Sequence, residues 1–447
     1  MFWLILIISW TIFIWDLYLS FRQYQVHKNT EKRPDHVAEI ISEEDYSKAR
    51  LYKVDKHEFD FLYSIYSQLL ITVVLCGNIF LWLWNKSGWI CERMNYNSEL
   101  LQSVVFASLI SVIETIIDFP WQAYDNFVIE EKHGFNKQTF GFFVKDKVKK
   151  TAVSLIIMAP IIAAVIYIIS HGGPYFFFYV WIFLSIVILL LMTVYPEFIA
   201  PLFDKYTPLP DSSLKTQIEE LAAKVNFPLK KLYVVHGSKR SAHSNAYMYG
   251  FWKNKRIVLY DTLLSDEMNN LLKEVSKKED GKDETTEEED SSVKKTGMSD
   301  VEVVAVLGHE LGHWALNHSV INLVITEVNL LFMLCVFSHF YQHPALYAAF
   351  GFLDSKPIII GLIIIFQYVN APYNELFSFV MTVMSRRMEF AADRYSQKLG
   401  HGENLCRSLI KLGKDNLSIP IDDPLYSMFN HSHPPIPERI ESLRKME

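Results

Sequence analysis

Blocks of about 20 predominantly apolar residues constrain this chain more than any other feature of its sequence. An α-helix of that length rises about 30 Å, which matches the hydrocarbon thickness of a bilayer. Half of the 447 residues are hydrophobic, and these blocks hold many of them. The sequence predicts seven membrane-spanning helices, at about residues 2–21, 60–84, 101–123, 152–170, 174–197, 319–341 and 357–382.

Lysine and arginine residues in the connecting loops predict the orientation of these helices, because cytosolic loops carry an excess of both. They gather in the loop that begins at Arg22, in the loop at 125–150 and at Arg386 and Arg387 after the last block. The alternate loops hold few of them. We therefore expect a multi-pass protein in the lipid bilayer, with a lumenal N-terminus and a cytosolic C-terminus.

Two segments outside the predicted spans, 199–318 and 383–447, are separated by two helices and are therefore expected on the same cytosolic face. In the first of them, runs rich in Tyr, Val, Ile and Phe at 231–235, 245–251 and 256–261 predict a small β-sheet.

A strongly charged stretch at 276–297 contains almost no apolar residue. It cannot bury enough surface to offset the entropy lost on ordering, so a disordered acidic insertion is predicted there. An acidic docking tail is the alternative.

The segment His309-Glu310-Leu311-Gly312-His313 indicates metal chemistry. It follows a capping box at Ser299 and Glu302, which predicts a helix to about residue 317. Two histidines four residues apart project from one face of a helix and can together chelate Zn²⁺, while the adjacent glutamate can accept a proton from water. The motif alone leaves an alternative open, a pair of surface histidines on a helix close to the membrane.

A third ligand is available in the C-terminal segment. Glu389 and Asp393 lie four residues apart in a predicted helix, so they share a face. The first could complete a His₂Glu site, and the second could accept the free N–H of a ligand imidazole. Ordinary surface charges are the alternative interpretation of this pair.

These elements, together with His431-Ser432-His433-Pro434-Pro435 near the end of the chain, resemble the integral-membrane CAAX prenyl protease family. Members of that family are zinc enzymes that process prelamin A and yeast a-factor. The resemblance covers nearly the whole chain and includes FVIEEKHGFN, IAPLFDKYT and SKRSAHSNAYMYG, at 127–136, 199–207 and 238–250. The insertion at 276–297 is the visible departure, and it puts no catalytic residue in doubt.

The resemblance implies a role for each matching residue and one zinc ion per chain. His309, His313 and Glu389 would bind zinc, Glu310 would be the general base, and Asp393 would support a zinc ligand. His433 would stabilise the oxyanion, and Asn245, on a predicted edge strand, would hold the substrate backbone.

The implied fold is mainly α, a seven-helix transmembrane bundle with a cytosolic zincin-like metalloprotease domain that carries a small β-sheet. The expected division is 1–198 for helices one to five, 199–318 for the protease segment with the HExxH helix, 319–382 for helices six and seven, and 383–447 for the segment that completes the zinc site.

The implied reaction is hydrolysis of the peptide bond after a prenylated cysteine, which releases the C-terminal tripeptide of a CAAX protein. For some substrates the family makes a second cut further upstream. The expected partners are prenylated proteins or peptides and the bilayer, and nucleic acid is not expected because the chain has no basic domain and no zinc-finger spacing. The expected location is the endoplasmic reticulum membrane, with the inner nuclear membrane as a further one and the active site towards the cytosol.

Two other functions remain as alternatives. An intramembrane zinc protease would take an aspartate ligand from a later span, and the sequence has no Leu-Asp-Gly there. A transporter or channel that binds metal through these histidines would show internal repeats, and none is visible among the predicted spans.

Overall fold

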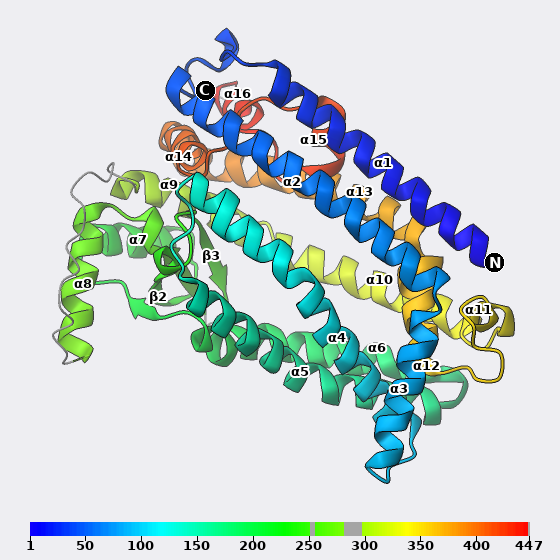
Figure 1. The fold of residues 1–447 in the computed structure, drawn as a ribbon. Helices are drawn as coiled ribbons and strands as arrows, with labels where there is room; N and C mark the ends of the chain where they lie inside the picture. Colours follow the sequence, from blue (N-terminus) through cyan, green and yellow to red (C-terminus); the bar gives the residue numbers. More distant parts are fainter. Residues whose placement is uncertain (251–254, 281–296, 446–447) are drawn as a thin grey trace.

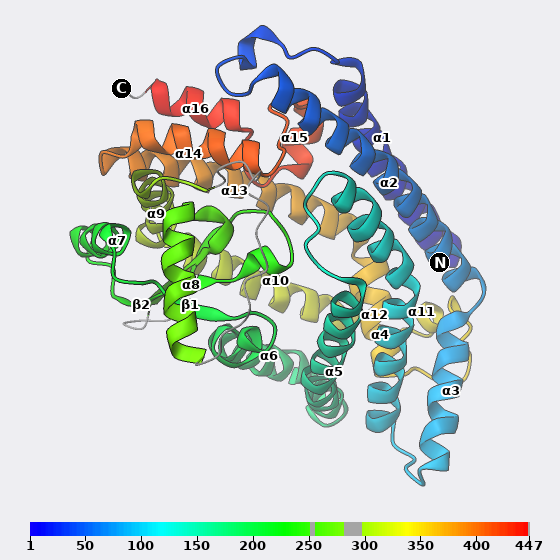
Figure 2. The ribbon, with the colours of Figure 1, turned by 60° about the vertical axis from the view of Figure 1, so that its left-hand side comes forward.

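The computed structural model describes residues 1–250, 255–280 and 297–445. Long helices form most of it, and a small sheet with several shorter helices lies at one end of them (Figures 1 and 2). Within the described residues, six helical stretches are long and apolar enough to cross a membrane. They contain α1 (Phe2–Asn29), α2 (Glu43–Cys76), α4 (Glu99–Tyr124), α5 (Phe140–His171), α6 (Phe176–Val194) and α10 (His318–Phe340).

The seventh predicted span, 357–382, is not one continuous helix, so the prediction of seven uninterrupted spans is wrong at this point. The chain forms α12 (Ile358–Ile363) and a π-helix (Ile364–Val369), breaks at Asn370 and continues as α13 (Ala371–Lys398). Pro372 lies in the first turn of α13, where its missing N–H is tolerated, but it cannot donate the bond that would extend the preceding helix. The expected boundary between 382 and 383 falls inside α13.

The second predicted span, 60–84, is also interrupted. α2 ends at Cys76, and a separate helix, α3 (Ile79–Arg93), follows it. The break coincides with Gly77 and Asn78, and Asn78 adopts a left-handed conformation with φ of 49°, which asparagine tolerates better than most residues.

The predicted strands are confirmed, and an additional short strand precedes them. The sheet has the order β1-β2-β4-β3. The parallel pair β2–β4 is central, and β1 and β3 each pair antiparallel at an edge. The strands are β1 (Tyr206–Pro208), β2 (Leu229–Val235), β3 (Ala246–Tyr249) and β4 (Lys255–Tyr260).

One hydrophobic core joins this sheet to two helices, α7 (Ser213–Lys224) and α9 (Asp300–Ala315). Val234 and Ile257 from the sheet and Leu307 from α9 are fully buried in it. The capping box predicted at Ser299 and Glu302 is present at the start of α9. The sheet therefore supports one face of the helix that carries the HExxH motif.

The prediction of a disordered insertion at 276–297 is wrong for its first five residues, which belong to α8 (Asp266–Asp280). Most of the predicted insertion, 281–296, lies outside the described residues. The remaining helices are short: α11 (Pro344–Ala348), α14 (Gly402–Asp415), α15 (Pro424–Asn430) and α16 (Ile436–Arg444). Of these, α14 packs on α9, and α13 contacts all of α14, α15 and α16. The end of the chain therefore lies against one side of the HExxH helix (Figure 2).

Candidate metal centre

The two histidines of the HExxH motif point to one place, as their spacing predicts. The Nε2 atoms of His309 and His313 lie 3.1 Å apart. His309 is buried and His313 is partly buried. Two ring nitrogens at this distance, each free of a backbone partner, are arranged to bind one ion.

Glu389 of α13 completes the group. Its Oε1 lies 3.3 Å from His313 Nε2, and its Oε2 lies 3.4 Å from His309 Nε2. One ligand atom from each of the three residues lies within 4.8 Å of the others, and within the described part of the chain this is the one such group of three or more. Glu389 Oε2 is buried yet has no hydrogen-bond partner among the described residues. A buried carboxylate oxygen without a partner is costly, and a bound cation would satisfy it, so these residues fit a metal ion.

Asp393, one turn after Glu389, orients His309. Its Oδ1 lies 2.8 Å from Nδ1 of His309, which leaves Nε2 to face the metal position. Arg439 of α16 donates to both oxygens of Asp393, at 2.6 and 2.8 Å. All three side chains are buried. The structure thus places Asp393 against His309, and it adds Arg439, which was not predicted because no motif links α16 to the metal site.

Charge in this group shifts the pKa values in a consistent way. Burial alone would lower the pKa of His309, but the hydrogen bond to Asp393 and the nearby Glu389 carboxylate outweigh it and raise that pKa to about 9. Burial would raise the pKa of Glu389, but the two histidines lower it. In Asp393, bonds from Arg439 and His309 likewise overcome burial and lower the pKa. Two anionic carboxylates thus surround a site that favours positive charge.

His313 has a polar partner of its own. Its Nδ1 lies 2.9 Å from Nδ1 of His318, the buried first residue of α10. Asn317, in a left-handed conformation with φ of 56°, turns the chain between α9 and α10 and so places His318 under the motif. The signal for His318 was a third histidine five residues after His313, which the sequence analysis did not use.

Two glycines let α9 and α13 approach closely. A Cβ at Gly312 would lie 3.0 Å from Cα of Ala392, and one at Gly308 would lie 2.9 Å from Oγ of Ser396. Ser396 also donates to the carbonyl of Ala305 at 3.1 Å. The glycine face of α9 therefore sets the distance from the histidines to Glu389.

The other predicted site residues surround this group to different degrees. Glu310 directly follows His309, and burial raises the pKa of its carboxyl group. His433 reaches the site from the loop after α15, with its Nε2 3.4 Å from Glu389 Oε1, and it stays 68% exposed. Asn245 is exposed and immediately precedes β3, an edge strand that contacts α9. Among the described residues, no hydrogen bond or ion pair joins Asn245 to the metal group.

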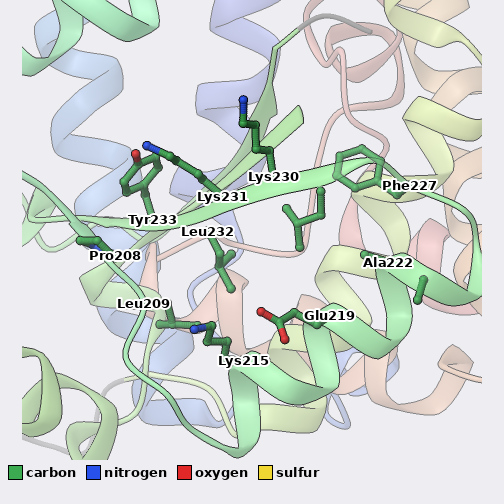
Figure 3. A pocket seen from close by; sticks show the side chains of 12 residues that line it. Pro208, Leu209, Lys215, Glu219, Ala222, Phe227, Lys230, Lys231, Leu232 and Tyr233 are labelled. Atoms are coloured by element: carbon green, nitrogen blue, oxygen red, sulfur yellow. The ribbon is translucent and has the colours of Figure 1, made fainter. Parts of the chain in front are cut away.

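A separate groove of about 510 Å³ lies between α7 and β2 (Figure 3). Its lining includes Leu209, Glu219, Phe227 and Leu232 and none of the residues of the metal group. The groove is therefore separate from the group of His309, His313 and Glu389.

The long apolar helices and the HExxH–Glu centre define a multi-pass membrane metallopeptidase. Residues 23–205 match the family described as CAAX prenyl protease N-terminal, five membrane helices, and residues 208–447 match peptidase family M48. The chain therefore belongs to peptidase family M48, and the predicted resemblance to the integral-membrane CAAX prenyl protease family is confirmed.

Relatives of similar length support this assignment. The chain is 55% identical to a CAAX prenyl protease 1 homolog of Caenorhabditis elegans, over 98% of this chain and 96% of the relative. It is 46% identical to a CAAX prenyl protease 1 homolog of Homo sapiens, over 99% of this chain and 95% of that relative. The crystal structure of S. mikatae Ste24p matches with a TM-score of 0.86 at 34% identity, over 99% of this chain and 98% of that one.

Proposed function

We propose that this chain is a zinc metalloendopeptidase that hydrolyses the peptide bond after a prenylated cysteine and releases the C-terminal tripeptide of a CAAX protein. The observation that carries the proposal is the group of His309, His313 and Glu389, in which Glu389 Oε2 has no hydrogen-bond partner among the described residues. The substrate class is supported by similarity over nearly the whole chain to proteins named CAAX prenyl protease 1 homologs.

We assign the metal as zinc, one ion per chain. Two imidazole nitrogens and one carboxylate, with room for water or substrate, are the ligand set of catalytic zinc sites. When bound there, zinc would supply Lewis-acid activation of water and of the substrate carbonyl. Asp393 holds the His309 ring in the tautomer that leaves Nε2 available, and His318 contacts the corresponding atom of His313.

The remaining residues transfer the proton and bind the substrate. Glu310 takes a proton from the attacking water and passes it to the amine of the departing peptide, and its raised pKa suits a group that must both accept and donate near neutral pH. His433 donates a hydrogen bond to the oxygen of the attacked carbonyl as negative charge develops there. Asn245 and the free edge of β3 bind the extended substrate backbone by strand addition.

We further propose that the metal centre faces the cytosol and that the protein resides in the endoplasmic reticulum membrane, and also in the inner nuclear membrane. The excess of Lys and Arg in the loops on the side of the centre supports this orientation. It also supports the division into 1–198, 199–318, 319–382 and 383–447, in which the second and fourth parts share one face.

The test compares the purified wild type with Glu310→Gln in detergent, by zinc content and by cleavage of a farnesylated CAAX peptide. About one zinc is expected in both proteins, with cleavage in the wild type alone. Glu403→Gln, on the exposed surface of α14, is the matched control and should cleave normally. Full activity of the Glu310 variant would refute the assigned base, and a wild type without bound metal would refute the proposed function.

A further inference from the structure

We propose that the first helix, α1, positions His433 for catalysis through the segment 421–423, so that Arg22 and Gln23 are positioning residues of the active site. The inference rests on the proposed role of His433. Its basis is a set of contacts between residues that lie about 400 positions apart in the sequence.

Arg22 binds Asp423 in a two-pronged ion pair. Its Nε donates to Oδ1 at 3.0 Å, and its Nη2 donates to Oδ2 at 2.8 Å. Planar pairs of this kind define geometry as well as adding energy. The Asp423 side chain is only 8% exposed, so solvent competes little for it.

Gln23 and His27, one helical turn apart on α1, bind the same segment. Gln23 accepts from the backbone N–H of Asp423 at 2.7 Å and donates to Asp422 at 2.6 Å. His27 lies 3.1 Å from the carbonyl oxygen of Ile421. Gln23 and His27 are each 2% exposed. Three neighbouring side chains of α1 therefore hold three consecutive residues of the C-terminal segment.

Asp423 connects the residues held by α1 to the start of α15. It is the N-cap of that helix and accepts from the N–H groups of Leu425 and Tyr426. A single carboxylate thus bonds Arg22 and starts α15. At the other side of α15, Phe429 packs against Trp15 of α1, with ring centroids 5.4 Å apart. The views from two directions both show α15 beside α1 (Figures 1 and 2).

α15 leads directly to the catalytic position. The helix ends at Asn430, three residues before His433, and the imidazole of His433 then lies 3.4 Å from Glu389. His433 itself is exposed, and besides Glu389 its polar partner among the described residues is the adjacent Ser432, whose Oγ lies 3.2 Å from Nδ1 of His433. Its position depends on where α15 begins and ends, and α1 determines where it begins.

The experiment is a double-mutant cycle between Arg22 and His433, with kcat, KM and zinc content measured on a farnesylated CAAX peptide. Arg22→Ala should lower kcat about tenfold to a hundredfold, because a displacement of about 1 Å in a catalytic group has effects of that size. KM and zinc content should stay near wild type. In the His433→Ala background, Arg22→Ala should have almost no further effect, since the group that it positions is gone.

Two more variants separate positioning from general destabilisation. Asp423→Asn keeps the cap of α15 but loses the charge that binds Arg22, so it should reproduce the loss of kcat. Arg22→Lys keeps the charge without the two-pronged geometry and should be intermediate. Arg407→Ala, which removes an exposed ion pair on α14, is the control and should behave as wild type.

The outcomes are distinct. If His433→Ala leaves kcat unchanged, the catalytic role proposed for His433 fails, and this inference fails with it. If His433→Ala lowers kcat but Arg22→Ala and Asp423→Asn do not, or their effects multiply with that of His433→Ala, α1 does not act through His433 and only this inference is overturned. Loss of zinc in the Arg22 and Asp423 variants would overturn it equally.

Discussion

Gly312 of α9 lies against the backbone of Ala392 in α13, with no space for a side chain between them. A Cβ on Gly312 would be 3.0 Å from Cα and 3.1 Å from the carbonyl oxygen of Ala392. Both partners of the contact are backbone atoms in long helices, so neither can give way locally. His313 directly follows Gly312, and Glu389 lies three residues before Ala392 in α13. Both are proposed ligands of the same ion, and the helix contact therefore determines their separation.

Gly312→Ala is expected to reduce both stability and zinc occupancy. The added methyl must push the helices apart, at a cost of about 1–3 kcal/mol for overpacking, and the shift separates His313 from Glu389. Zinc affinity should fall at least about tenfold. Metal content after dialysis against a zinc buffer, together with thermal unfolding in detergent, measures both effects.

Gly141→Ala is the matched control, because it makes the same change in a helix with nothing within 4 Å of the new Cβ. Its zinc content should equal that of the wild type. Equal zinc affinity in the Gly312 and Gly141 variants would show that the contact does not set the ligand geometry.

Arg439→Met is expected to damage the centre although it replaces none of the proposed ligands. The substitution leaves the buried carboxylate of Asp393 without its two bonds from Arg439, and breaking a buried ion pair from one side costs about 3–5 kcal/mol. His309 would lose its fixed orientation, so zinc affinity should fall about 10–100-fold. Competitive zinc titration and thermal unfolding measure the two losses, and Arg407→Met on the exposed face of α14 provides the control. A variant with normal affinity would show that Asp393 alone orients His309.

Features of the site that depend on local sequence patterns could be predicted, and those that depend on contacts between distant segments could not. The positions of His309 and His313 follow from helix periodicity alone, and so does the pairing of Glu389 with Asp393, so these were predictable. The partner of Asp393 was not, because Arg439 lies 46 residues away on a helix whose packing depends on the whole C-terminal fold. The same is true of the contacts between Arg22 and Asp423.

The breaks in two predicted spans have a different cause. Hydropathy averages over a window, and a single Pro372 or the pair Gly77-Asn78 does not change that average enough to divide an apolar block. Backbone chemistry decides the break instead, through a missing N–H in one case and a left-handed residue in the other. Among the described residues, six helical stretches are therefore long and apolar enough to cross a membrane, where the sequence predicted seven.

His318→Ala is expected to weaken the metal centre through His313. The imidazole of His318 is the partner of His313 Nδ1, at 2.9 Å, so its loss leaves the ring of a proposed ligand free to rotate. Zinc affinity should fall about tenfold or more. His318→Gln, which can still form a hydrogen bond at that position, should restore part of it. If Ala and Gln at this position give the same affinity, the hydrogen bond is not what matters.

As the pH rises, the stability of the metal-free protein should fall, and its apparent affinity for zinc should rise. In the folded, metal-free protein, the hydrogen bond to Asp393 and the nearby Glu389 carboxylate overcome burial and raise the pKa of His309 from 6.5 to about 9. A raised pKa means that the proton stabilises the fold fully below pH 6.5 and that this contribution is lost as the pH rises towards 9. Zinc must displace the same proton, so its apparent affinity should rise with pH over that window, by about tenfold per pH unit. Thermal unfolding of the chelated protein and zinc titrations at pH 6.5, 7.5 and 8.5 test both trends, with His309→Gln as the variant in which the falling stability should disappear. A zinc affinity that is flat over this range would mean that His309 is already neutral in the metal-free protein.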